Sequence, residues 1–224
     1  MKRLAFHTLD VFTEKRLGGN PLAVVLEADG LPQGQMQAIA REFNLSETVF
    51  VQRPTADGAL VRARIFTPFE ELPFAGHPTI GTACLLADLG LAPEGADVRF
   101  VLEEGIGNVA VRVTRAPGAV PFGELTAAQP PQAGPAAPDA SAIARVLGLE
   151  PEDLASGDER PRHASCGLPT LLVPLRMPEL LAGIAVDVTA LAALLGGAWA
   201  HNLYVYARGY EGELRARMFS PTVA

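Results

Sequence analysis

Hydrophobic and polar positions in the first half of the chain follow the two periodicities of regular structure. Six segments alternate or run apolar in the manner of strands, with glycine-containing turns between several of them. One segment instead places Met36, Ile39, Ala40 and Phe43 on a single helical face, and Asn44 suits its left-handed end. The predicted strands are 3–12, 21–28, 47–54, 59–68, 97–105 and 107–116.

A second helix is predicted over residues 78–90, where small and apolar side chains surround the axis. A helix that is apolar on every side is a buried helix. The strands around it are then expected to form a closed or nearly closed sheet with a filled middle. We assign this first barrel domain to residues 1–117.

The second half begins with a change of composition. Residues 118–138 are rich in Pro, Ala, Gly and Gln without periodicity, which indicates a domain linker. Residues 139–224 are then expected to form a second domain, with helices that begin at Asp139 and Asp187. Its predicted strands are a run over 163–176, broken by Gly-Leu-Pro, and a final hairpin over 201–221.

One stretch occurs twice. The letters RARIFTP run over 62–68 and RARMFSP over 215–221, which indicates a duplicated unit. In the first copy the stretch leads into a loop and the apolar helix. The second copy stands three residues before the last residue of the sequence.

The composition of the chain argues against several classes of function. The 224 residues are 49% hydrophobic and 19% charged, which is typical of a globular chain. A net charge of -7 argues against a nucleic-acid groove or an anionic membrane surface. The start of the chain does not resemble a signal peptide, and no apolar run reaches the roughly 20 residues of a membrane span, so we expect a cytoplasmic protein. Two cysteines form no metal-ligand pattern, and no metal site is predicted.

Two stretches carry candidate chemistry. In NLSETVF, Glu47 stands at a helix-to-strand corner among apolar residues, where desolvation would raise its pKa as proton transfer requires. In LPFAGHPTIGTA, unpaired amides after Gly76 could bind a substrate carboxylate, with a neutral His77 beside them. An ordinary solvated loop glutamate and a structural histidine are the alternatives, and the residues leave both open.

Five motifs occur here in the order of one family: GNPLAVV, IAREFNLSETVF, RARIFTPFEELPFAGHPTIGTA, GLPTLLVPL and RARMFSP. With them the chain resembles the PhzF-like family of phenazine-biosynthesis isomerases, from Phe6 to Pro221. The resemblance implies an α+β fold of the diaminopimelate-epimerase-like type. Two similar β-barrel domains, each around a central helix, would face each other across a substrate cleft.

The resemblance also implies roles. Glu47 matches the glutamate that takes a proton from one ring carbon of a dihydro-hydroxyanthranilate and returns it to another, and His77 matches a substrate-holding histidine. The family uses no metal or organic cofactor, and the implied partners are a small-molecule carboxylate and a second copy in a homodimer. Residues with implied substrate-binding roles are Asn20, Ser46, Gly76, Pro78 and Thr79.

The sequence departs from the family pattern after its second motif. Family members continue with an acidic residue and a Gly-Ser helix start, whereas this sequence ends at Ala224. We therefore expect the second barrel domain to lack its central helix in this chain. A barrel without that helix would contain a large apolar cavity.

Three functions follow. The first is an isomerase or epimerase that moves a proton on a small carboxylate by acid/base catalysis. The second is a shortened, non-catalytic member that acts as a binding or interaction module. The third is a two-cysteine racemase, which the sequence disfavours because His77 occupies the helix start and Cys84 lies about two turns deeper.

Overall fold

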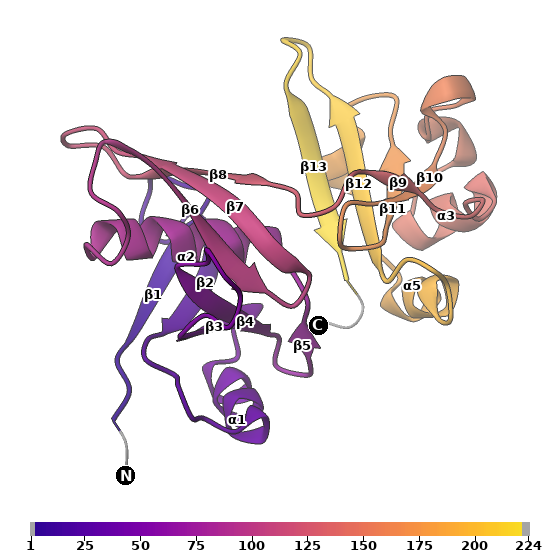
Figure 1. Ribbon diagram of the computed structural model, residues 1–224. Coiled ribbons are helices and arrows are strands. Elements are labelled where there is room, and N and C mark those ends of the chain that lie inside the picture. The colour runs from indigo at the N-terminus through magenta and orange to yellow at the C-terminus, as the bar shows by residue number, and fades with distance from the viewer. Residues whose placement is uncertain (1–2, 221–224) are drawn as a thin grey trace. The chain divides into compact units, whose positions relative to one another are not determined.

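A computed structural model describes residues 3–220 (Figure 1). The chain divides into two compact units, with the boundary between Gln129 and Pro130. Among the described residues no helix is both long and apolar enough to cross a membrane. Pro221, the last residue of the second repeated motif, lies outside the described residues, as does everything after it.

The first unit is built on one curved sheet with the strand order β1-β2-β3-β4-β6-β7-β8, and the short β5 pairs with β4. Neighbouring strands are antiparallel except β2 with β3 and β4 with β6. The strands are β1 (Phe6–Val11), β2 (Asn20–Val25), β3 (Glu47–Gln52), β4 (Val61–Phe66), β5 (Glu71–Leu72), β6 (Asp97–Glu104), β7 (Gly107–Thr114) and β8 (Phe122–Thr126).

Helix α2 (Gly76–Asp88) lies inside the curve of this sheet and contacts β1 to β4, β7 and β8 (Figure 1). It begins and ends two residues earlier than the sequence predicts. The edge strands β1 and β8 do not pair, so the sheet is a half-barrel and is not closed. Helix α1 (Gln33–Phe43) packs against Phe50 and Phe66 on the other face, and Asn44 ends it in the left-handed conformation, as expected.

The second unit is a five-stranded sheet with the order β13-β12-β11-β10-β9. Helices α3 (Ala140–Leu147), α4 (Leu180–Gly183) and α5 (Val188–Leu195) share a core with β11 and β12. Two 3₁₀ turns, η1 and η2, follow α3. The remaining bounds are β9 (Gln132–Ala133), β10 (Arg162–Ser165), β11 (Thr170–Pro174), β12 (Asn202–Arg208), β13 (Leu214–Phe219), η1 (Pro151–Asp153) and η2 (Gly157–Glu159).

The structure differs from several of the expected elements. The segment 118–138 contains β8 of the first sheet and β9 of the second. The single broken strand over 163–176 is in fact two antiparallel strands, β10 and β11. Asp187 caps α5 by accepting a hydrogen bond from the Ala190 amide, whereas Asp139 stands at the N-cap of α3 without a side-chain cap bond.

The internal repeat predicted from the sequence is present in the topology. The steps β1-β2, β2-β3 and β3-β4 are antiparallel, parallel and antiparallel. The steps β10-β11, β11-β12 and β12-β13 follow the same series. In both repeated strands an arginine lies over the phenylalanine two residues on: Arg64 is 5.3 Å from the Phe66 ring centroid, and Arg217 is 4.9 Å from that of Phe219.

The repeat differs in what covers the inner face of its sheet. Ile65 of β4 is buried in the core that includes Ile80 and Leu85 of α2. Met218 occupies the matching position of β13 and is 50% exposed, and its cross-strand neighbour Tyr204 is 38% exposed. In the described part of the second unit this face is therefore open.

Candidate active site

The starts of two strands and one helix bring three polar residues together in the first unit. Asn20 is the first residue of β2, Glu47 is the first residue of β3, and His77 is the second residue of α2. Side chains of a strand alternate between its faces, so Glu47 shares a face with Val49 and Val51, which belong to the core beneath α2. The period of β3 therefore directs Glu47 to the start of α2.

His77 connects the other two side chains. Its Nε2 lies 3.2 Å from Glu47 Oε2, and its Nδ1 lies 3.1 Å from Asn20 Nδ2. The Asn20 NH2 can only donate to Nδ1, whereas the Pro21 carbonyl, which also bonds to His77, can only accept from the ring. Nε2 of His77 faces the Glu47 carboxyl group, at hydrogen-bond distance but without the alignment of a full hydrogen bond.

Burial shifts the pKa values of the two ionisable groups of this site in opposite directions. Glu47 and His77 are each only 9% exposed. Loss of water disfavours the charged forms, so burial raises the pKa of Glu47 to about 7 and lowers the pKa of His77 to about 4. Near neutral pH Glu47 therefore exists in both protonation states while His77 stays neutral. A group that takes and returns a proton needs this balance.

The first turn of α2 leaves backbone donors beside this pair. Within the described structure the amides of Gly76 and His77 have no partner, and the amide of Thr79 is bonded to the Ala75 carbonyl at 3.2 Å. A Cβ placed at Gly76 would meet no atom within 4 Å, so there is open space beside these donors. Free amides and the helix dipole at such a terminus favour an anion.

The other predicted binding residues differ in their exposure to solvent. Ser46 precedes Glu47 and is half-buried. Pro78 and Thr79 are buried, and the Thr79 hydroxyl is already bonded to Ala75 and to Glu104. Of the predicted set, the structure thus brings Asn20, Glu47 and His77 into contact, with Gly76 next to them along the helix.

The sequence reasoning missed Glu104, the last residue of β6. This side chain is 5% exposed, and burial raises its pKa to about 7; a hydrogen bond donated by Thr79 to the ionised carboxylate would act in the opposite direction. Its signal in the sequence is the alternation of β6: Val98, Phe100 and Leu102 face the core, and Glu104 is next in that series. A carboxyl group at an inward-facing strand position is unusual.

The two cysteines differ in burial and lie in different units. Cys84 lies in α2 in the first unit, and burial raises the pKa of its thiol to about 11, with Asp88 adding to the rise. Cys166 is exposed in the second unit. Among the described residues no group of three or more His, Cys, Asp or Glu side chains is placed to hold a metal ion.

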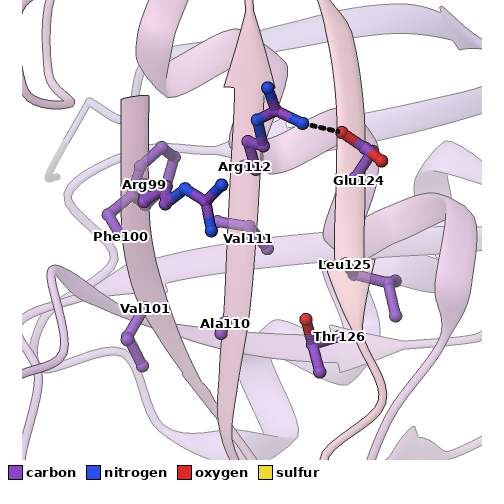
Figure 2. A pocket seen from close by; sticks show the side chains of 9 residues that line it. All are labelled: Arg99, Phe100, Val101, Ala110, Val111, Arg112, Glu124, Leu125 and Thr126. Atoms are coloured by element: carbon purple, nitrogen blue, oxygen red, sulfur yellow. Dashed lines mark hydrogen bonds and ion pairs between the residues drawn. The ribbon is translucent and has the colours of Figure 1, made fainter. Parts of the chain in front are cut away.

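A hollow of about 460 Å³ lies elsewhere, on the outer face of β6, β7 and β8 (Figure 2). Figure 2 shows Arg112 of β7 ion-paired with Glu124 of β8. Arg112 also pairs with Asp97 of β6. Neither Glu47 nor His77 lines this hollow. Its open wall offers no buried acid or base, so the Glu47–His77 pair remains the candidate active site.

Comparison with known proteins places this chain in a family. The family model described as phenazine biosynthesis-like protein, PhzC-PhzF, matches residues 9–224. The chain belongs to the PhzF family of isomerases. This PhzF-family chain is 44% identical to an uncharacterized isomerase of Mesorhizobium japonicum over 95% of its own length and 71% of that relative.

Two further comparisons extend this result. The trans-2,3-dihydro-3-hydroxyanthranilate isomerase of Pseudomonas fluorescens is 36% identical, over 95% of this chain and 70% of that enzyme. The crystal structure of the PhzF-family phenazine biosynthesis protein of Bacillus anthracis superposes with a TM-score of 0.82 at 28% identity, over 98% of this chain and 73% of that one. The α+β, diaminopimelate-epimerase-like fold with two sheets is shared with more distant solved structures.

Proposed function

We propose that this PhzF-family protein moves a proton between two positions of a small carboxylate-bearing substrate, with Glu47 as the acid/base. The observation that carries the proposal is the buried contact between Glu47 and His77 at the start of α2. A carboxyl group whose pKa lies near 7 can act as a base in one step and as an acid in the next.

The proposed reaction is balanced without a co-reactant. Ionised Glu47 removes a proton from one carbon, and the electron pair of that C–H bond moves into the substrate's conjugated system. Protonated Glu47 then returns the proton to a different carbon, so no electrons enter or leave the substrate. The chemistry needs a positioned acid/base and exclusion of water, and we propose that it uses no metal or organic cofactor.

The neighbouring groups have supporting roles in this proposal. In the tautomer with its proton on Nε2, neutral His77 donates to ionised Glu47 after a small rotation of the ring or the carboxyl group and so orients the carboxylate. The free amides of Gly76 and His77 bind the substrate carboxylate in the open space beside Gly76. Asn20 acts by holding His77, and Ser46 and the backbone at Pro78 and Thr79 complete the wall of the site.

The substrate class is proposed from the relatives. The Pseudomonas fluorescens relative is named for trans-2,3-dihydro-3-hydroxyanthranilate, a cyclic carboxylate. We propose that this chain acts on a small cyclic or amino-acid-like carboxylate as a cytoplasmic homodimer. An anionic ligand of this size suits two backbone amides at a helix start.

Deuterium incorporation tests the role of Glu47. Candidate carboxylates are incubated with the protein in deuterated water, and the label at carbon is followed by mass spectrometry. Replacement Glu47→Gln keeps the size of the side chain and removes the base, so we expect exchange to fall by roughly a hundred-fold or more. The matched control is Glu70→Gln, an exposed position of the same unit, which should exchange like the parent. Equal rates in Glu47→Gln and the parent would refute the assignment.

The second candidate function is a non-catalytic binding module. The open apolar face at Tyr204 and Met218 favours it, because the matching face of the first unit holds the apolar helix α2. The corresponding partner is an apolar helical segment. In that case the parent chain would show no more deuterium exchange than Glu47→Gln with every carboxylate tried, and Met218→Glu would weaken helix binding.

A further inference from the structure

The hydroxyl group of Thr79 has two partners but only one hydrogen. Its Oγ1 lies 2.7 Å from the Ala75 carbonyl oxygen and 2.7 Å from Glu104 Oε1. A carbonyl oxygen can only accept, so both contacts are hydrogen bonds only when the Thr79 hydrogen lies toward Ala75, whose oxygen also accepts from the Thr79 amide. The contact with Glu104 then needs a hydrogen from the other side. Only a protonated carboxyl group supplies it.

The surroundings of Glu104 favour this neutral form. The second oxygen, Oε2, is buried without a hydrogen-bond partner, which is far less costly for a neutral acid than for a carboxylate. The cationic side chains of β4 are engaged elsewhere, since Arg62 and Arg64 pair with Glu103 and Glu71. His77 of α2 is neutral and lies against Glu47. Within residues 3–220, Glu104 therefore has no cation paired with it.

Glu104 also stands where β6 meets the entry to α2. The next residues along the chain turn against Pro73, since the Ile106 amide donates to the Pro73 carbonyl at 2.9 Å. Ala75 is the N-cap of α2 and Thr79 lies four residues further on. The Glu104–Thr79–Ala75 chain of hydrogen bonds thus spans the turn that carries Gly76 and His77.

We propose that Glu104 is a positioning residue that works as a neutral acid: its proton holds the Thr79 hydroxyl on Ala75 and fixes the helix turn that presents His77 to Glu47. The inference rests on the proposed function, since it assigns a task in the same site. When Glu104 ionises it can only accept a hydrogen bond. Thr79 must then donate to Glu104 or to Ala75, and one of the two contacts is lost.

The protonation state is tested by infrared spectroscopy, which needs no substrate. Protonated carboxyl groups have a carbonyl band of their own, and Glu47 and Glu104 should both contribute to it below about pH 7. In Glu47→Gln we expect one such band, which titrates near pH 7 and disappears in the double variant with Glu104→Gln. The exposed control Glu70→Gln should change nothing. A Glu47→Gln protein without the band at about pH 6 would overturn the proposal.

The positioning role is tested by hydrogen exchange and by the pH profile. In the parent, exchange of the Thr79 amide, which is bonded to the Ala75 carbonyl, should accelerate as pH rises above about 7, beyond the ordinary pH dependence of exposed amides. Glu104→Gln can donate from its amide at every pH, so this acceleration should be absent, and the alkaline fall of kcat should shrink by roughly three-fold or more. Thr79→Val removes the hydroxyl and should show fast exchange at all pH values, whereas Thr79→Ser should behave like the parent.

These readouts separate the two proposals. If deuterium exchange at carbon fails to depend on Glu47, the infrared and amide-exchange results still report on Glu104. If Glu104→Gln and the parent show the same amide exchange above about pH 7, the positioning role is refuted whatever the catalytic result.

Discussion

At the residue scale, the site depends on three buried ionisable groups with few charged neighbours. Glu47 and Glu104 gain a raised pKa because the folded protein removes their water, and for the same reason His77 has a lowered pKa. In the described structure Glu47 and His77 are each other's ionisable partner. Below about pH 7 both members of the pair are mostly neutral, which avoids most of the cost of burying charge.

These shifts predict how stability depends on pH. The pKa of Glu47 is about 7 in the folded state, against 4.5 for an ordinary glutamate, so its stabilising contribution is complete below pH 4.5 and is lost as pH rises to about 7. We expect the free energy of unfolding of the parent to fall by about 3 kcal/mol more than that of Glu47→Gln over this range. Urea denaturation at a series of pH values measures the difference.

His77 affects the pH dependence of stability with the opposite sign. Its pKa is lower in the folded state, so its contribution is present above pH 6.5 and is lost as pH falls to about 4 in both proteins. Parallel stability curves for the parent and Glu47→Gln between pH 4.5 and 7 would contradict a buried, protonated Glu47.

At the scale of elements, α2 combines a packed body with an open first turn. Ten of its residues are buried, which explains why its sequence is apolar on all sides. Gly81 allows the helix to approach β1 and β2: an added Cβ would lie 2.6 Å from Leu22 Cδ2 and 2.7 Å from Val11 Cγ2. Gly76, five residues earlier, faces open space.

Two glycine substitutions in this helix should therefore have opposite effects. Gly81→Ala should destabilise the protein by about 1 to 3 kcal/mol through overpacking, although alanine is the better helix former. Gly76→Ala should leave stability unchanged or raise it by up to about 1 kcal/mol. It should also raise KM, because the new methyl group occupies the space beside the free amides. Thermal unfolding and steady-state kinetics measure both, and a stabilised Gly81→Ala would refute the close approach.

At the scale of the whole molecule, the same strand topology occurs in both units, but the inner face of the sheet is covered by a helix only in the described part of the first unit. The repeated strands β4 and β13 match residue by residue, including the arginine over the phenylalanine. Yet Ile65 is buried beneath α2, and Met218 is half-exposed in the described second unit. The same sequence motif thus contributes differently to the free energy of unfolding in each unit.

A matched pair of truncations measures that difference. Ile65→Ala should cost about 2 to 5 kcal/mol, because it removes a buried side chain from a closed core. Met218→Ala should cost less than about 1 kcal/mol, since half of the side chain is already in water. Equal costs in chemical denaturation would mean that the inner face of the second sheet is covered in solution.

The periodicity of the chain predicted most strands, α1, α2 and the repeat. It failed at β8 and β9, because these short strands lie in a Pro- and Gly-rich segment whose own pattern is weak, and pairing with β7 and β10 decides their structure. Glu47 and His77 can be identified from the residues that flank them in the sequence. The contact of Asn20 with His77 joins residues 57 positions apart, and no local pattern indicates it.

The sequence by itself determined most helices and strands of the first unit, that one unit occurs twice, and that a helix apolar on all sides is buried. These follow from side-chain periodicity, which depends on near neighbours along the chain. Only the tertiary structure decided that Glu47, Glu104 and His77 lose their water and which partners they meet. Desolvation is set by atoms from distant segments, so the pKa of a carboxyl group follows from the packed fold.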